Sequence, residues 1–328
     1  MIALIDLINL TKPYLTNTLI SPDSLNSIEA HCSKMSPVYH TIYYEIRANE
    51  DKRVDLTSMS GAVTFSDYLD KNELESNNYL TTIKKWLSNV QVPLMSVEFD
   101  FVDNQVKNSF FIWAVHKGYT KSKNGVFDPV EAHKLIVNCL KYEDVLLAAG
   151  LDNEIKNTLN KVPVMGNVLH VLSLKSRGLD AIRIVVGIPI LSCKSFLKSI
   201  SWTGNYDLLQ SLIDIIKQFN FVISFQLTYS EKLMPSIGLE VYAIDPSNIQ
   251  RNKLEFRLFF KLLEKQNLID SGKIDDVVNW PGISRVNAEL IDWKMDILRD
   301  VNVKFIISND QFPEVKYYLG ANAVYKLF

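Results

Sequence analysis

Alternating apolar and polar side chains mark five stretches of this chain as β-hairpins. In the middle one, 169–188, Arg183 interrupts a row of isoleucines and valines and falls on the face opposite Ile184, because successive side chains of a strand point to opposite faces. The first strand of this hairpin has Leu172 and Leu174 on its apolar face. Each hairpin therefore has one apolar and one mixed face. The five predicted hairpins span 38–63, 93–118, 169–188, 221–244 and 301–320.

Apolar residues recur with a helical period in the segments between the hairpins. Predicted helices cover 1–35, 72–90, 128–159, the two sides of a break at 202–204, and 250 to about 298 with a break at 279–282. The order ββα thus repeats along the chain, and no Pro/Gly/Ser-rich linker divides it. We expect one domain over 1–328, with an N-terminal helical segment, 1–35, and a ββα-repeat barrel, 36–328.

Ten antiparallel strands need an arrangement that leaves no exposed sheet edge. Closing the sheet into a barrel removes both edges. The amphipathic helices must then cover the apolar strand faces from outside, and the mixed faces line a lumen. The pattern predicts an α+β fold: a ten-stranded antiparallel β-barrel built from repeated ββα units and surrounded by helices.

Composition and charge narrow the class of protein. The 328 residues are 47% hydrophobic with a net charge of −2, which argues against a general nucleic-acid binder. Three cysteines without a CxxC motif indicate a reducing compartment. The apolar N-terminus is short and interrupted by Asp6, so we expect neither a signal peptide nor membrane insertion. These features predict a soluble cytoplasmic protein, monomeric or homodimeric.

The repeated ββα order over nearly the whole chain resembles the ABBA prenyltransferases, whose barrel of ten antiparallel strands is ringed by helices. In that family the lumen binds an allylic diphosphate through inward-facing Arg, Lys and Tyr, and an early-strand acid contacts the acceptor in indole-type members. This chain has matching residue types on its predicted lumen face, at Glu98, Arg183, Lys304, Lys316 and Tyr318. It departs from the Arg-x-Lys-x-Tyr pattern of some members, because Glu314 stands where the Arg would be.

The resemblance implies roles for these side chains. Arg183, Lys304, Lys316 and Tyr318 would bind the diphosphate leaving group, since converging cations and phenols stabilise it. Glu98 would orient or deprotonate the nucleophile. A carbocation needs dry, aromatic walls, and the predicted wall residues are Tyr39, Tyr43, Gln226, Glu240 and Tyr242. Glu240 could equally be a structural partner of a lumen cation.

Other constellations are weaker. A DDxxD motif is missing, and Asp275-Asp276 is expected on a solvated helix surface. No metal-ligand spacing occurs, although Mg²⁺ stays open as a cofactor because the sequence does not decide the metal requirement. Lys175 and Arg47 lie near turns and are expected to face solvent, and His170 is expected in the core or on the surface.

The sequence therefore predicts a prenyltransferase of natural-product biosynthesis, with an allylic diphosphate and an aromatic or peptide acceptor as its partners. Two alternatives remain. One is a non-catalytic barrel that binds a lipid-like ligand or peptide. The other is an accessory protein of a peptide-modification pathway, in which the lumen would be filled and an apolar surface patch would contact the partner.

Overall fold

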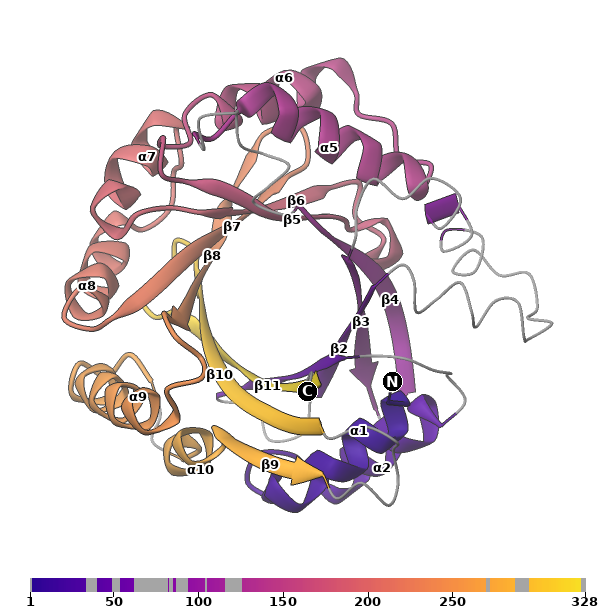
Figure 1. Ribbon diagram of the computed structural model, residues 1–328. Helices are drawn as coiled ribbons and strands as arrows, with labels where there is room; N and C mark the ends of the chain where they lie inside the picture. Colours follow the sequence, from indigo (N-terminus) through magenta and orange to yellow (C-terminus); the bar gives the residue numbers. More distant parts are fainter. Residues whose placement is uncertain are drawn as a thin grey trace.

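Ten antiparallel strands close into a barrel in the computed structural model (Figure 1), which describes residues 2–33, 40–48, 54–61, 82, 85–86, 94–103, 105–115, 126–269, 272–286 and 295–325. The last strand pairs with both its hairpin partner and the first strand, which completes the ring. The predicted barrel is confirmed. Its strands are β1 (Thr41–Arg47), β2 (Val54–Gly61), β3 (Leu94–Val102), β4 (Gln105–Ala114), β5 (Asn167–Ser173), β6 (Ile182–Gly187), β7 (Phe221–Tyr229), β8 (Leu233–Ala243), β10 (Met295–Ile307) and β11 (Glu314–Tyr325).

An eleventh strand, β9 (Gly282–Val286), lies outside the ring and pairs with the first part of β10. The helix predicted up to about residue 298 is therefore wrong over Gly282–Val286 and from Met295 onward, and its part over 287–294 lies outside the described residues. In β10, Met295, Ile297, Arg299 and Val301 are buried, while the residues that alternate with them are less so. Burial at every second residue is the period of a strand, and it extends β10 six residues before the predicted start of its hairpin.

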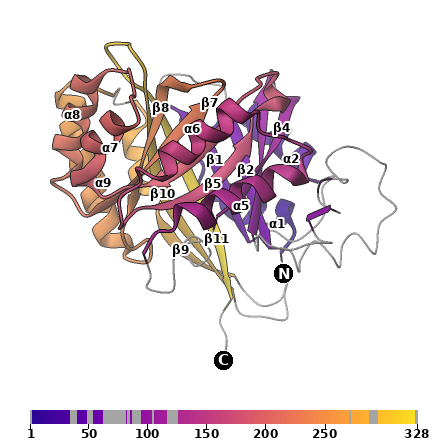
Figure 2. The same cartoon turned by 90° about the horizontal axis from the view of Figure 1, so that it is seen from above.

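Eight α-helices in the described part of the chain surround the barrel (Figure 1). Figure 2, seen from above, shows α7, α8 and α9 beside the strands and α5 and α6 in front of them. The helix predicted over 72–90 lies outside the described residues except for three positions. The helices are α1 (Leu4–Thr11), α2 (Pro22–Cys32), α5 (Pro129–Tyr142), α6 (Ala149–Leu159), α7 (Cys193–Ser199), α8 (Tyr206–Ile216), α9 (Ile249–Lys265) and α10 (Ile274–Asn279), with 3₁₀ turns η1 (Lys12–Tyr14), η2 (Lys175–Arg177) and η3 (Ile190–Ser192).

Local chemistry fixes where these helices begin. The Asp128 carboxylate accepts hydrogen bonds from the first backbone amides of α5, and Pro129 occupies the first helical position, where a missing amide hydrogen has no consequence. Elsewhere on the outside of the barrel, the Thr11 hydroxyl of α1 lies 2.9 Å from the Tyr44 hydroxyl of β1. The N-terminal helical segment thus packs on the outer face of the barrel.

No helix of the described ranges has the length and apolar character needed to cross a bilayer.

One strand presents its faces the other way round from the prediction. Leu172 lines the lumen, and Leu174 joins it in a small apolar cluster inside the barrel, whereas Val171 is buried in the main core. Leu172 pairs directly with Arg183, and directly paired residues share a face. A register shift between Val168 and His170 precedes this pair. The expected helix-facing role of Leu172 and Leu174 is therefore wrong.

Replacing Ile184 with alanine should lower the free energy of unfolding by about 2–5 kcal/mol, because Ile184 is fully buried in the core outside the strands. The matched control is Ile283→Ala on β9, where the side chain is 55% exposed and the change should stay within about 0.5 kcal/mol. Urea denaturation of both variants measures the difference. Equal losses would contradict the placement of this strand face.

Candidate functional site

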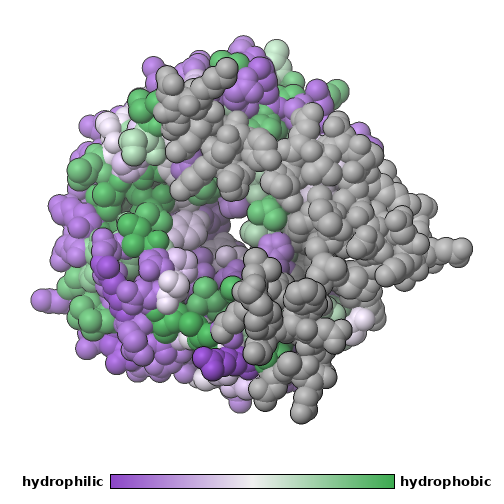
Figure 3. Space-filling model, in the orientation of Figure 1, coloured by the Kyte–Doolittle hydropathy of each residue, from purple (hydrophilic) through white to green (hydrophobic). Residues whose placement is uncertain are grey.

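The lumen encloses a cavity of about 140 Å³ to which each of the ten barrel strands contributes at least one side chain. Figure 3 shows a central opening on one face of the molecule, bordered in part by hydrophilic side chains. Tyr39 lies outside the described residues, and Lys316 is in the lumen beside the cavity. The predicted site residues that line the cavity are Tyr43, Glu98, Arg183, Gln226, Glu240, Tyr242, Lys304 and Tyr318.

Two cations reach this cavity without a carboxylate partner. Arg183 of β6 donates hydrogen bonds to Thr228 Oγ1 at 3.0 Å and to Gln226 Oε1 at 3.3 Å. Lys304 of β10 donates to the Tyr318 hydroxyl at 3.2 Å. Neither forms an ion pair with any residue of the described ranges. Neutral groups therefore accept their hydrogen bonds at contact distance, and carboxylates act on their charges only from further away.

The electrostatics of Lys304 reflect this arrangement. Burial and the nearby positive charge of Arg183 together lower the pKa of its ammonium to about 8, against the opposing effect of two glutamates. Burial, together with the charge of Arg177, also lowers the pKa of Arg183. An anion placed between Arg183 and Lys304 would relieve the repulsion and favour the charged form of both groups.

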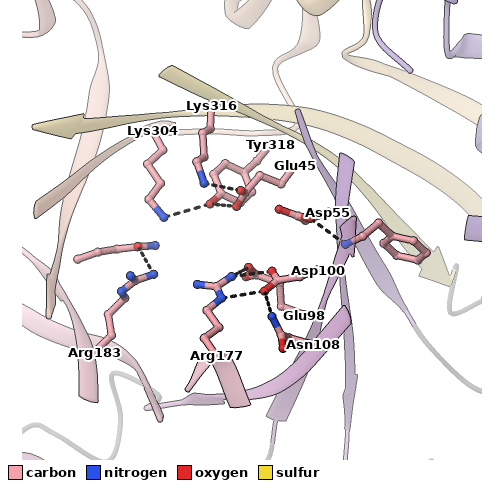
Figure 4. A network of polar contacts seen from close by, with 12 residues as sticks. Glu45, Asp55, Glu98, Asp100, Asn108, Arg177, Arg183, Lys304, Lys316 and Tyr318 are labelled. Atoms are coloured by element: carbon pink, nitrogen blue, oxygen red, sulfur yellow. Dashed lines mark hydrogen bonds and ion pairs between the residues drawn. The ribbon is translucent and has the colours of Figure 1, made fainter. Parts of the chain in front are cut away.

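Lys316 and Tyr318 are held by a glutamate that we assigned no role from the sequence. Glu45 of β1 accepts a hydrogen bond from Lys316 Nζ at 2.8 Å and another from the Tyr318 hydroxyl (Figure 4). Although burial opposes ionisation, the ammonium groups of Lys316 and Lys304 hold the pKa of Glu45 well below its usual range. Strand alternation puts Glu45 on the same face as Tyr43, and this pattern could have identified Glu45 as a lumen residue from the sequence.

Two basic residues near turns lie differently from what the sequence suggested. Arg47 was expected to face solvent, but it is buried and its guanidinium lies 2.9 Å from Asp55. Arg177, from the η2 turn, was assigned no role. It donates two hydrogen bonds to Asp100, at 2.7 and 2.8 Å, and one to Glu98 at 3.0 Å (Figure 4). The left-handed Gly178 that follows (φ 73°) lets the turn close, and period-two alternation cannot place a turn residue.

Glu98 is the candidate acid–base group of the cavity. Burial and the negative charge of Glu45 together raise the pKa of its carboxyl to about 7, against the opposing charge of Arg177. A carboxyl with a pKa near neutrality can both accept and release a proton at physiological pH. The strand β3 places it in the lumen, as the sequence predicted.

Glu240 belongs to a cluster of neutral donors. Its carboxylate accepts hydrogen bonds from Ser224 at 3.0 Å, from Gln226 and from Tyr242. Gln226 also accepts from Arg183, so it links the cation to Glu240 through one amide. The cluster fixes the orientation of Gln226 and Tyr242 at the cavity wall.

Two polar atoms of the cavity wall have no hydrogen-bond partner in the described part of the chain. They are Thr57 Oγ1 and His170 Nδ1, and both are buried. His170 thus lines the cavity rather than the core or the surface, and burial lowers the pKa of its imidazole. Buried polar groups are usually paired, so this wall can offer hydrogen bonds to a polar ligand.

Neither comparisons with known proteins nor a search of the described side chains for metal ligands identifies the function of this cavity. Neither a known protein-family model nor a curated protein matches the sequence. Over the described ranges, no three His, Cys, Asp or Glu side chains are grouped so that they could hold a metal ion. The likeness to ABBA prenyltransferases therefore rests on element order and the residue types in the lumen.

Glu98→Gln should make stability above pH 5 depend less on pH. The folded-state pKa of about 7 exceeds the ordinary value of 4.5, so the folded protein holds the proton more tightly. That contribution to stability is lost as pH rises through 7. The free energy of unfolding of the variant, relative to the natural protein, should therefore increase between about pH 5 and 7.

Urea titrations at several pH values measure this difference. Glu231→Gln is the control, because Glu231 is exposed in the β7–β8 turn and should leave the pH profile unchanged. Parallel profiles for Glu98→Gln and the natural protein would mean that Glu98 does not bind a proton more tightly in the folded state.

Proposed function

We propose that this protein is a prenyltransferase that moves an allylic isoprenoid from its diphosphate to an aromatic or peptide acceptor. One observation carries the proposal: Arg183 and Lys304 line the same cavity, and both have only neutral partners at contact distance. A diphosphate would supply the missing negative charge and accept charge-assisted hydrogen bonds from both. The resemblance in element order supports the same conclusion.

The reaction breaks the bond between C1 of the isoprenoid and the diphosphate oxygen, and the electron pair leaves with the diphosphate. Arg183 and Lys304 would stabilise the charge that develops there. The acceptor then forms a new bond to C1, and its proton passes to the carboxylate of Glu98. The pKa of about 7 suits Glu98 to take up this proton near neutral pH.

The walls of the cavity suit an allylic carbocation. Tyr43, Tyr242 and Tyr318 line it together with apolar residues that include Ile112 and Leu172. Aromatic faces attract positive charge, and bound substrates that fill the lumen would limit quenching of the carbocation by water. A cavity of about 150 Å³ holds one benzene-sized molecule, so the volume of about 140 Å³ favours a five-carbon dimethylallyl group.

A second candidate is a barrel that binds an anionic small molecule without turnover. The ion pairs of Lys316 with Glu45 and of Arg177 with Asp100 favour it, because they neutralise two lumen cations within the protein itself. Both candidates predict anion binding at Arg183 and Lys304. They differ in whether a product forms.

Dimethylallyl diphosphate should raise the melting temperature, since a ligand at 100 times its Kd stabilises a protein by about 2.7 kcal/mol. Arg183→Ala and Lys304→Met should each weaken binding by about tenfold or more, because each removes a charge-assisted hydrogen bond of about 1.5–3 kcal/mol. The controls are Arg257→Ala and Lys261→Met, which change exposed residues of α9. Calorimetric titration measures the affinities.

Binding should be tested with five-, ten- and fifteen-carbon diphosphates, with and without Mg²⁺. If none of them binds, the prenyltransferase proposal is wrong. Glu98→Gln should keep diphosphate binding and lower the transfer rate by about 10²–10⁴-fold, measured as prenylated product from indole or tyrosine-containing peptides. Tight binding without product from any such acceptor would favour the non-catalytic barrel.

A further inference from the structure

A second cavity, of about 210 Å³, adjoins the first at the point along β10 where its pairings with β8 and β9 both end. β9 pairs with β10 up to Arg299, and β8 pairs with it from Asn302 onward. Asp300 and Val301 lie between these two pairings, so the barrel wall is interrupted there. The cavity shares Tyr43, Tyr242 and Asn302 with the first cavity.

Part of the wall of this second cavity comes from outside the barrel. Phe256 and Asn252 of α9 line it, as do Pro246 and Pro281 from the adjoining connections. The cavity therefore joins the lumen to the helical layer through the gap between β8 and β9. Its lining residues include one carboxylate, Asp300, and no basic side chain.

The carboxylate of Asp300 forms no ion pair within the described ranges, and a hydrogen bond from its own backbone only partly offsets the effect of burial. Its Oδ1 atom is buried and has no hydrogen-bond partner in the described ranges. Gly320, which pairs with Asp300 across β10 and β11, makes room for it, since a Cβ there would lie 1.8 Å from Oδ1. Burial raises the pKa of Asp300 to about 6, so the group is still largely ionised at pH 7 and above.

The nearest arginine along the strand does not neutralise this charge. Arg299 is next to Asp300 on β10, and successive side chains point to opposite faces. Its guanidinium donates to the Trp280 carbonyl oxygen at 3.0 Å and lies 3.4 Å from the centre of the Tyr14 ring. Asp300 thus carries a negative charge on a wall that is otherwise neutral and partly aromatic.

We propose that Asp300 binds a cationic nitrogen group, an alkylammonium or a guanidinium, in the second cavity. The carboxylate would accept its hydrogen bonds, and the Tyr43 and Tyr242 rings can attract the same charge through their faces. We assign this group to the acceptor, and that assignment rests on the proposed prenyl transfer. The cation site itself does not.

The row of lumen residues on β10 sets the distance between the two sites. Asp300, Asn302 and Lys304 are every second residue of β10 and therefore lie on one face of the strand. Four residues of strand span about 13 Å, so the ammonium and diphosphate ends would be separated by roughly that length. An acceptor with its positive nitrogen at Asp300 would therefore reach the isoprenoid with a nucleophilic atom that is several bonds away from that nitrogen. The acceptor class is a nucleophile that also carries an amine or guanidine.

Small cations without any diphosphate test the site. n-Butylammonium and n-butylguanidinium should bind the full-length protein at pH 8, and 1-butanol should bind about tenfold more weakly or worse, because it lacks the charge. Asp300→Asn should weaken binding of both cations by about tenfold or more. The control Asp310→Asn changes an exposed residue in the β10–β11 turn and should leave it unchanged. Saturation-transfer NMR titrations give the affinities.

A second measurement needs no variant. The carboxyl carbon resonance of Asp300 reports its pKa, which saturating n-butylammonium should lower by about one unit or more, as an opposite charge nearby does. Equal binding of 1-butanol, equal binding by Asp300→Asn, or an unchanged pKa would each overturn the cation site. Diphosphate binding is measured separately, so failure of this site and failure of the prenyltransferase proposal are distinguishable.

Discussion

Compensation of charge inside a closed barrel is the constraint on which the lumen depends. Closure removes sheet edges but turns every second side chain of ten strands inward. A buried charge is strongly unfavourable unless it is paired. Most of the lumen meets this requirement internally, as Glu45 does with Lys316 and Asp100 with Arg177. The places where it is not met are therefore informative about ligands.

Two such places carry opposite signs. Arg183 and Lys304 share one cavity and contact neutral groups only, whereas Asp300 lines the adjoining cavity with a buried, unpartnered oxygen. A protein under selection for stability alone could pair or remove these charges. Their presence on one continuous inner surface favours a ligand set in which one member is anionic and the other cationic. That is why we favour a two-substrate reaction over simple anion binding.

The sequence predicted the elements better than the details of the lumen. Period-two alternation identified all five hairpins and the inward direction of Glu98, Arg183 and Lys304, because strand geometry decides those features locally. It did not give the strand face on which Leu172 lies, since the register shift in β5 depends on the neighbouring strand. It also missed Arg177, which enters the site from a turn, and β9, whose five residues are too short for a reliable pattern.

The same charge constraint couples the two cavities. A positive and a negative charge 13 Å apart attract each other by about 1 kcal/mol at an effective dielectric constant of 20. A cation at Asp300 and a diphosphate at Lys304 would feel this attraction, so each would strengthen binding of the other by the same factor of about five. A diphosphate bound alone would also cancel the effect of Lys304 on Glu98, whose pKa that ammonium lowers. Glu98 would then hold a proton more readily, and a cationic acceptor would oppose that change. The charge of the acceptor thus helps to keep the proposed base ready to accept a proton when both substrates are present.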